Sequence, residues 1–514
     1  MTEQERINRN ELCTRLMSEG IDPRQEVDAV ARTDTLVTLA IELGRNDSLA
    51  CALSWLDNLE QSGVHDESAI ILDYCRANAI AQNRYGTKWQ WEQPTLSREI
   101  YYLRRAISHT KFRRIVETTR CMILNNLGNR LRVAGRIVEA LEYWRRALEV
   151  LPMFGMALCN RALAFAQYAD AIEDTGKRAL FLWMAHNEAS VALASTSIYT
   201  DPHDAQTMET VKELKEDIEV AVDVKGISAC NPLSWPDTST TKEEHDYQNW
   251  CLRNCLYLDP LNDLGWHAVA ISDSLGLAGH VVRIDAPHRF ESFFDQMKQE
   301  YVSARWLLYE GLNMKTPHFS DKDVFLHVTE PRPVLSLTIE KVKTAYRIAY
   351  SLFDKVSFFV NAFMELGIPE KHVSFRKLWR PNKEKPIRIE FDQTINWAFC
   401  ALYWLAKDLF EKENDEVSEP QARGLSDIRN YLEHKYLRIT ADKPTTAPPD
   451  DVALMVSREQ FESKALHILK LARSALIYLT IGVRFEEDRR QPDRTGEQIG
   501  EIPLTPHLPD AEKI

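Results

Sequence analysis

Three side chains close together in the sequence have the chemistry needed to act on a phosphate ester: Arg429, Asn430 and His434. A guanidinium binds phosphate oxygens through paired hydrogen bonds, and an imidazole can give or take a proton near neutral pH. An amide beside them can orient either partner. These three residues, called the motif residues below, therefore predict acid/base chemistry at a bound phosphate.

The spacing of the motif arginine and histidine is weak evidence alone, because it occurs twice elsewhere. It recurs at Arg104 and His109 and at Arg283 and His288. The first of these pairs lies in a predicted array of repeats, and the second contains Pro287, which breaks a helix. The motif residues instead lie on a predicted short helix that follows loop-forming residues, so context favours them.

The local sequence predicts how this short helix begins. Ser426 or Asp427 is expected to cap its start, which would place Arg429 in the first turn, where free N–H groups and the helix dipole favour an anion. Asn430 is four residues from the motif histidine, shares its face and is expected to orient its ring. The alternative is that the motif arginine pairs with Glu433 on a solvated face and the histidine is incidental.

Other polar residues of the C-terminal third could support such a site. Asp354 and Asn361 lie seven apart on one face of an apolar helix, where a buried hydrogen bond or ion pair is the competing role. The basic stretch 371–388 is a plausible RNA track or, equally, a solvated loop. His467 has no partner in sequence and is expected at the surface. The RNA-binding candidates in the basic stretch are Arg376, Lys377, Trp379 and Arg380.

Composition limits the classes of function. A formal net charge of −13 argues against bulk electrostatic binding of nucleic acid, so any RNA contact must be local to one site. Phosphate-loop, dinucleotide-binding, zinc-protease and nucleophile-elbow patterns are missing from the sequence. Nine scattered cysteines without a CxxC pair predict idle thiols and no metal site, and no cofactor is expected. The sequence has no secretory signal and no run approaching the roughly 20 apolar residues of a membrane span, which predicts a cytoplasmic protein.

The elements that must position these residues are helical, and the predicted fold class is all-α. Residues 1–230 are expected to form helix after helix, with one good match to a tetratricopeptide (TPR) repeat and degenerate neighbours. In that repeat, Gly128 and Ala140 allow close approach of two helices, Trp144 fills the gap, and Pro152 follows the second helix. One repeat cannot bury its own face, so several are expected.

The remainder divides into a connector, a bundle and a tail. Residues 231–330, punctuated by X-Pro pairs, are expected to form a connector with mixed structure, including a short strand or turn between Gly276 and Asp285. Residues 331–490 are predicted to form a bundle with helices over 338–366, 396–412, 425–439 and 458–485. Residues 491–514 are polar and predicted to be disordered.

The motif residues, in the third helix of a C-terminal bundle, resemble the R-N-x3-H motif of the HEPN superfamily. The flanking segments 351–361 (SLFDKVSFFVN), 374–379 (SFRKLW) and 256–264 (LYLDPLNDL) resemble a bacterial branch in which TPR-like repeats precede a HEPN ribonuclease-type domain. The resemblance covers roughly residues 230–485 and implies a four-to-five-helix HEPN bundle behind the repeats.

The resemblance also implies an activity. Many HEPN proteins are metal-independent endoribonucleases that leave a 2′,3′-cyclic phosphate and a 5′-hydroxyl. His434 would then be the general acid or base, Arg429 would stabilise the transition-state charge, and Asn430 would orient His434 or the phosphate. HEPN domains usually dimerise so that two motifs line one cleft, which implies a homodimer with RNA as its partner.

Two functions therefore remain open. The first is a HEPN-type endoribonuclease, a regulated toxin or antiviral defence effector whose TPR-like half senses a protein or peptide partner. The second is a non-enzymatic interaction protein with a HEPN dimerisation or nucleotide-binding domain. The sensor hypothesis predicts that residues 331–490 expressed alone are more toxic than the full chain. Exposure of Arg429 and His434 in a shared cleft would separate the two functions.

Overall fold

The computed structural model describes most of the chain. The described residues are 3–82, 89–93, 95–199, 204–234, 236, 239–281, 289–327, 332–382, 385–410, 417–420, 422–441, 452–491 and 513. Most of the predicted disordered tail, residues 492–512 and 514, lies outside them, as do residues 442–451. The turn expected between Gly276 and Asp285 is described only as far as Val281.

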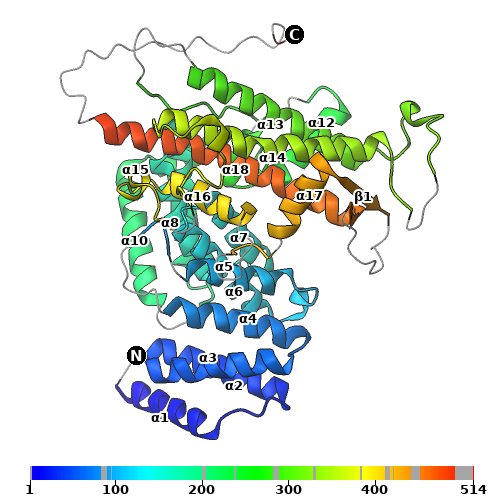
Figure 1. Ribbon diagram of the computed structural model, residues 1–514. Helices are drawn as coiled ribbons and strands as arrows, with labels where there is room; N and C mark the ends of the chain where they lie inside the picture. Colours follow the sequence, from blue (N-terminus) through cyan, green and yellow to red (C-terminus); the bar gives the residue numbers. More distant parts are fainter. Residues whose placement is uncertain are drawn as a thin grey trace.

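Ten helices, called the array below, make up the N-terminal part of the molecule (Figure 1). They are α1 (Glu3–Glu19), α2 (Glu26–Leu43), α3 (Asn46–Ser62), α4 (Asp66–Ala81), α5 (Leu96–Ser108), α6 (Glu117–Val133), α7 (Ile137–Val150), α8 (Gly155–Asp170), α9 (Thr175–Ala192) and α10 (Asp204–Ala221). Successive helices pack against each other, which is the arrangement expected of helical repeats. Their assignment as TPR repeats stays a prediction.

The best-matching repeat packs as its sequence predicts. It forms the helix pair α6 and α7, and Trp144 is fully buried between them. A Cβ atom on Gly128 would lie 2.5 Å from the Trp144 ring nitrogen, so only glycine allows this approach. The same nitrogen donates to the Asn125 carbonyl at 3.2 Å. Gly135, in the turn after α6, has φ +76° and lies against the backbone of Trp397, in a later helix, where a side chain would collide.

The C-terminal half is a helical bundle with two short strands, so the all-α prediction is confirmed. Its long helices are α13 (Arg289–Asn313), α14 (Leu337–Phe363), α16 (Trp397–Phe410), α17 (Ala422–His434) and α18 (Arg458–Arg490). These five are called the bundle below. Shorter elements are α11 (Val224–Ala229), α12 (Lys242–Arg253) and α15 (Ile389–Asp392). The strands are β1 (Tyr436–Thr440) and β2 (Ala453–Ser457).

The prediction that one helix covers residues 425–439 is wrong at its C-terminal end. The helix ends at His434, and after Lys435 the next five residues form β1, which pairs in parallel with β2. The sequence of β1, YLRIT, is rich in aromatic and β-branched residues, which favour strands. The Val334 N–H also donates to the Ile439 carbonyl at 2.7 Å. The strands therefore stop the motif helix at its histidine.

Array and bundle share one hydrophobic core. Helices α1 to α3, with part of α4, have a core of their own, but the rest of the array packs into the same cluster as α13 to α18. Trp91, just before α5, lies 6.2 Å from Trp379 of the bundle region between ring centroids, and its indole N–H donates to the Thr394 carbonyl at 3.0 Å. The two halves are therefore one folded unit.

Helix α18 runs through the middle of this unit (Figure 1). It contains a stretch long and apolar enough to cross a membrane, which the sequence analysis did not single out, and 83% of that stretch is buried inside the protein. The apolar residues of α18 thus have packing partners in the fold, and a helix at the centre of a bundle needs such residues on all sides.

Candidate active site

Helix α17, which carries the motif residues, is fixed along one face by packing. Leu425, Ile428 and Leu432 recur at helical spacing and are buried. On the facing helix α14, the Tyr346 hydroxyl donates to the Leu425 carbonyl at 2.8 Å, and Arg347 donates to the Leu432 carbonyl at 2.5 Å. These contacts at both ends fix α17 against α14.

The start of α17 differs from the prediction. The helix begins at Ala422, so Ser426 and Asp427 lie inside it and do not cap it. Arg429 is consequently in the middle of the helix, where backbone N–H groups are bonded within the helix. The predicted anion site at a helix N-terminus is therefore wrong. The misjudged boundary has a local cause, because both residues favour caps in sequence but are tolerated within helices.

Arg429 is half-buried over α14. Its guanidinium lies 5.9 Å from the centre of the Tyr350 ring and donates to Asn430 Oδ1 at 3.3 Å. The alternative pairing with Glu433 is not formed, because Glu433 contacts Arg347 of α14 at 3.5 Å. Asn430 thus orients the arginine of the motif rather than its histidine.

His434 is the last residue of α17 and is exposed. Within the described part of the chain, its ring makes no hydrogen bond or ion pair. A structural histidine is normally held by a partner, whereas this ring is open to an incoming group. Among the motif residues, His434 is therefore the one most available to a ligand.

Asp354 is a carboxylate from another helix that the structure brings near Arg429. It follows Tyr346 and Tyr350 at four-residue steps along the face of α14 that meets α17. Burial raises the pKa of Asp354, whereas the Arg429 charge and a backbone hydrogen bond from Phe375 lower it. Asp354 therefore supplies Arg429 with a nearby negative charge.

Asn361 has a different role. Its amide donates to the Ile368 carbonyl and accepts from the Ile368 N–H, both at 3.1 Å. This pair of hydrogen bonds closes the turn after α14. Asn361 therefore has the structural hydrogen-bonding role that the sequence analysis gave as the alternative to a role in the active site.

Of the comparisons with known proteins, one finds a family for the C-terminal half of the chain. Residues 281–486 match the model of the family described as LA2681-like HEPN. This range contains all three motif residues and the five bundle helices except the last residues of α18. Residues 281–486 are a HEPN domain. Searches with the whole chain found no matching curated protein and no matching solved structure.

The HEPN domain begins earlier than the predicted boundary at residue 331. The match starts at residue 281 and includes α13, which packs along α14. Segment 231–330 was expected to be a connector with mixed structure. Its described residues form α12, α13 and short 3-10 helices, without a strand. The last part of that segment is thus an integral helix of the HEPN domain.

The basic stretch of the HEPN domain divides into surface and core. Arg376 and Lys377 are exposed, and they directly follow Phe375, whose backbone contacts Asp354. Trp379 is 1% exposed and packs against aromatic side chains, so it is not a stacking platform for RNA. Arg380 is ion-paired with Glu92 of the array. The predictions of RNA contact at Trp379 and Arg380 are therefore wrong, because these two side chains join the HEPN domain to the array.

A buried ionic network, which the sequence analysis missed, joins the HEPN domain to the array. Asp408 of α16 is fully buried and accepts from Arg104 of α5 at 2.8 Å and from Arg136, just before α7. Although burial acts to raise it, these two arginines hold the pKa of Asp408 below its ordinary value. Arg104 also donates to the Ser418 carbonyl at 3.1 Å. Ser418 lies four residues before α17, so the array contacts the segment that leads into the motif helix.

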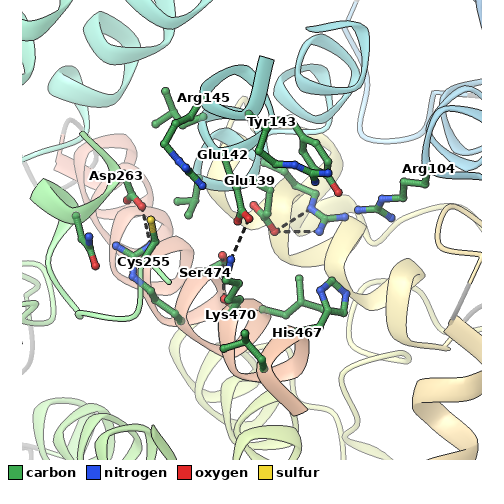
Figure 2. A pocket seen from close by; sticks show the side chains of 18 of the residues that line it. Arg104, Glu139, Glu142, Tyr143, Arg145, Cys255, Asp263, His467, Lys470 and Ser474 are labelled. Carbon is green, nitrogen blue, oxygen red and sulfur yellow. Dashed lines mark hydrogen bonds and ion pairs between the residues drawn. The ribbon is translucent and has the colours of Figure 1, made fainter. Parts of the chain in front are cut away.

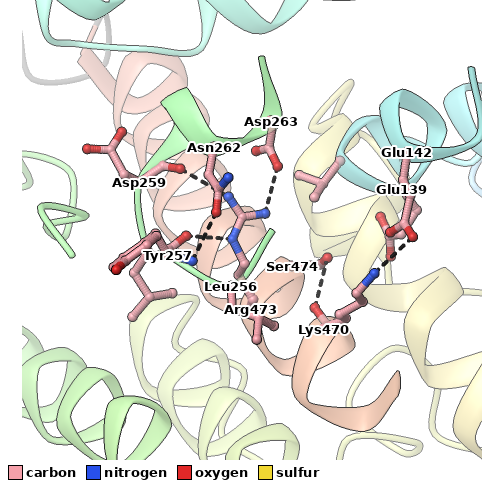
Figure 3. Close-up of polar contacts among 12 residues, drawn as sticks. Glu139, Glu142, Leu256, Tyr257, Asp259, Asn262, Asp263, Lys470, Arg473 and Ser474 are labelled. Atoms are coloured by element: carbon pink, nitrogen blue, oxygen red, sulfur yellow. Dashed lines mark hydrogen bonds and ion pairs between the residues drawn. The ribbon is translucent and has the colours of Figure 1, made fainter. Parts of the chain in front are cut away.

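The conspicuous segment 256–264 also has a structural role (Figure 3). Arg473 of α18 donates to the carbonyls of Tyr257 and Asp259 at 2.6 and 3.0 Å and to the Asp263 carboxylate at 2.7 Å. Asn262 accepts from the Tyr257 N–H at 3.2 Å. An arginine whose donors are satisfied in this way fixes the segment against the HEPN domain.

Among the described residues, no group of three His, Cys, Asp or Glu side chains is arranged to hold a metal ion. The site assembled from the sequence and the structure thus consists of His434, Arg429 with Asn430, and Asp354, with Arg376 and Lys377 beside them.

Proposed function

We propose that this protein is a HEPN-type endoribonuclease that cleaves RNA to a 2′,3′-cyclic phosphate and a 5′-hydroxyl. His434 acts as general acid or base at the 2′-hydroxyl or the leaving 5′-oxygen. Arg429 stabilises the negative charge of the transition state, and Asn430 orients its guanidinium. The observation that carries the proposal is the exposed His434, whose ring has no partner among the described residues, on the same helix as Arg429 and inside the HEPN match.

The geometry of α17 favours a site built by two copies of the chain. His434 is five positions after Arg429, which is a rise of about 7.5 Å and a rotation of about 140° along an α-helix. One phosphate group is too small to contact both side chains easily from a single helix. A homodimer in which two α17 helices face each other would bring the arginine of one copy near the histidine of the other.

The neighbouring charges support RNA as the substrate. Arg376 and Lys377 lie next to the residue that contacts Asp354, so a strand at the motif would pass them. Their local positive charge matters because the chain as a whole carries a net charge of −13. Single-stranded RNA fits this arrangement, since its 2′-hydroxyl is the nucleophile that the proposed chemistry needs.

The wider role follows from the domain arrangement. We place the protein in the cytoplasm as a regulated toxin or antiviral defence effector. The TPR-like array binds a protein or peptide partner, as helical repeats commonly do. Because Arg104 of the array contacts Ser418, four residues before α17, partner binding at the array could change the position of α17.

The test compares purified wild-type protein with His434→Ala on a labelled single-stranded RNA. We expect cleavage to fall by about 10²- to 10⁴-fold, as for loss of a general acid or base. The melting temperature should not change, because the ring is exposed. His372→Ala, which removes another exposed histidine of the HEPN domain, is the matched control.

Two further measurements separate mechanisms. Cleavage should persist in EDTA, and a substrate with a single 2′-deoxy nucleotide at the cut site should resist. If His434→Ala cleaves at the wild-type rate with the same melting temperature, the assignment of the histidine is wrong. A dimeric, folded wild type that cleaves no RNA would favour the non-enzymatic interaction protein.

A further inference from the structure

A cavity of about 260 Å³ lies at the junction of array and HEPN domain, away from the motif residues (Figure 2). Helix α7 forms one wall and α18 the opposite wall, and Cys255, Asn262 and Asp263 close a third side. We call it the junction cavity. Most small-molecule sites are about 300–1,000 Å³, so this cavity suits a ligand at the small end of that range.

The deeper charges around the cavity already have partners. Arg104 and Arg136 share Asp408, and Arg473 is held by Asp263. These ion pairs join α5, α7, α16 and α18, and they account for the structural part of the cavity wall. They leave little capacity for a ligand, so binding must depend on the remaining cations.

Those remaining cations gather around one carboxylate, Glu142. Lys470 of α18 contacts it at 2.9 Å, and Figure 2 shows Arg145 reaching in from α7. Burial acts to raise the pKa of Glu142, but Lys470, Arg145 and Arg146 together hold it below its ordinary value. Arg145 also pairs with Glu149 on the solvent side. Among the described residues, Arg146 and Lys470 therefore share one carboxylate, that of Glu142.

Two of the lining side chains have unused hydrogen-bonding capacity. Arg146 makes no hydrogen bond or ion pair within the described residues, and its guanidinium lies 5.0 Å from the centre of the Tyr143 ring. His467, expected at the surface, is half-buried in the wall and also has no hydrogen-bond partner among the described residues. Burial lowers its pKa, so at neutral pH it offers one N–H donor and one acceptor.

We propose that the junction cavity binds a small molecule that carries a phosphate group. At pH 7 a phosphate monoester has a charge of about −1.5 to −2 and three acceptor oxygens, which Arg146, Lys470 and Arg145 can bind. A ligand with one carboxylate group would bring a single negative charge, which is no more than Glu142 already provides to these cations. The site lies outside the motif, and its occupancy does not depend on the proposed nuclease activity.

Such a ligand would contact α7 and α18 at once. It would therefore bind only the arrangement in which the array is docked on the HEPN domain, and it would stabilise that arrangement against unfolding.

The test uses full-length protein, isothermal titration calorimetry and melting temperature. The probes are inorganic phosphate, pyrophosphate and a nucleoside 5′-monophosphate, which distinguish a bare anion from a phosphorylated organic molecule. We expect at least one probe to bind and raise the melting temperature. Arg146→Gln should weaken binding about tenfold to a hundredfold, as expected for loss of a charge-assisted hydrogen bond. Arg113→Gln, an exposed arginine of the array, is the control and should bind normally.

Glu142→Gln is the decisive variant, because the proposal predicts that this change increases the affinity for phosphate. Without the competing carboxylate, phosphate should bind more tightly, a result that misfolding cannot produce. The proposal is overturned if no probe binds wild-type protein at millimolar concentration. It is also overturned if Arg146→Gln and Glu142→Gln bind like wild type. A short 5′-hydroxyl RNA that displaces the monophosphate, with the same dependence on Arg146, would assign the cavity to RNA and overturn the small-molecule proposal.

Discussion

The exposed face of α17 and the junction between array and HEPN domain hold polar residues under opposite conditions. On α17, His434 is exposed and, within the part of the chain that the structure describes, has no partner, while Arg429 has one weak hydrogen bond and a ring contact there. At the junction, Asp408 is fully buried and bonded to two arginines and to Ser418. Polar groups without partners are open to a substrate, whereas buried, paired charges are costly to break.

This difference shows why arginine and histidine content alone cannot locate an active site. Arg104 and His109 have the same spacing as the motif pair, yet Arg104 is a structural residue of the junction. Burial and existing partners separate the two pairs. The comparison also predicts that junction variants lose stability whereas motif variants lose activity.

Removing the array should have the largest effect. Residues 331–490 alone would expose the surfaces around Trp379 and Trp404 that pack on Trp91, and would lose α13. We therefore expect no cooperative thermal transition by circular dichroism and strong binding of a hydrophobic dye. The sequence-based expectation that this piece is more toxic than the full chain requires it to fold. A fragment that melts cooperatively and is more toxic would restore that expectation.

Asp408→Ala should have the next largest effect. It leaves Arg104 and Arg136 buried without their shared counter-charge, which we expect to cost about 3–5 kcal/mol of unfolding free energy. Urea denaturation measures the loss. Asp246→Ala, which breaks an exposed ion pair with Lys242, is the control and should cost much less, because exposed ion pairs contribute little to stability. Equal effects of the two variants would contradict the structural role of the junction.

The double variant Arg376→Gln/Lys377→Gln should have a smaller effect, confined to RNA. If both side chains contact phosphates, binding should weaken several-fold, and the salt dependence of log K should become less steep by about 1.4. The melting temperature should not change, since both residues are exposed. Fluorescence anisotropy at several salt concentrations measures this, with Arg113→Gln/Arg114→Gln as the control. An unchanged salt dependence would remove these residues from the RNA path.

Asp354→Asn should have the smallest effect, visible as a change in pH dependence. Because burial raises the folded-state pKa of Asp354 above its ordinary value in an unfolded chain, its contribution to stability is greatest below that ordinary value. The contribution is lost as pH rises through the folded-state pKa. The asparagine variant should therefore have a flatter stability curve from pH 4 upward, measured by urea denaturation across pH. A curve parallel to that of the wild type would show that Asp354 does not titrate as proposed.

Some features of the fold and site were predictable because they depend on neighbours in sequence. Gly128, Ala140 and Trp144 are close enough along the chain for one helix pair to explain them, and that pair is present. The four predicted bundle helices are present with shifted ends. The start of α17 was misjudged because cap-forming residues lie inside it, and its end because β2, the partner of β1, is distant in sequence.

By itself, the sequence determined the helical class, the repeated helix pairs and the candidate motif, because local periodicity and residue type carry that information. The tertiary structure alone decided which arginines are structural, since Arg104, Arg136 and Arg473 find their carboxylates or carbonyls more than 200 residues away. The tertiary structure also shows that Trp379, which was expected to contact RNA, is a residue of the hydrophobic core. An exposed side chain and a buried one can have the same local sequence, and only the packing of distant segments distinguishes them.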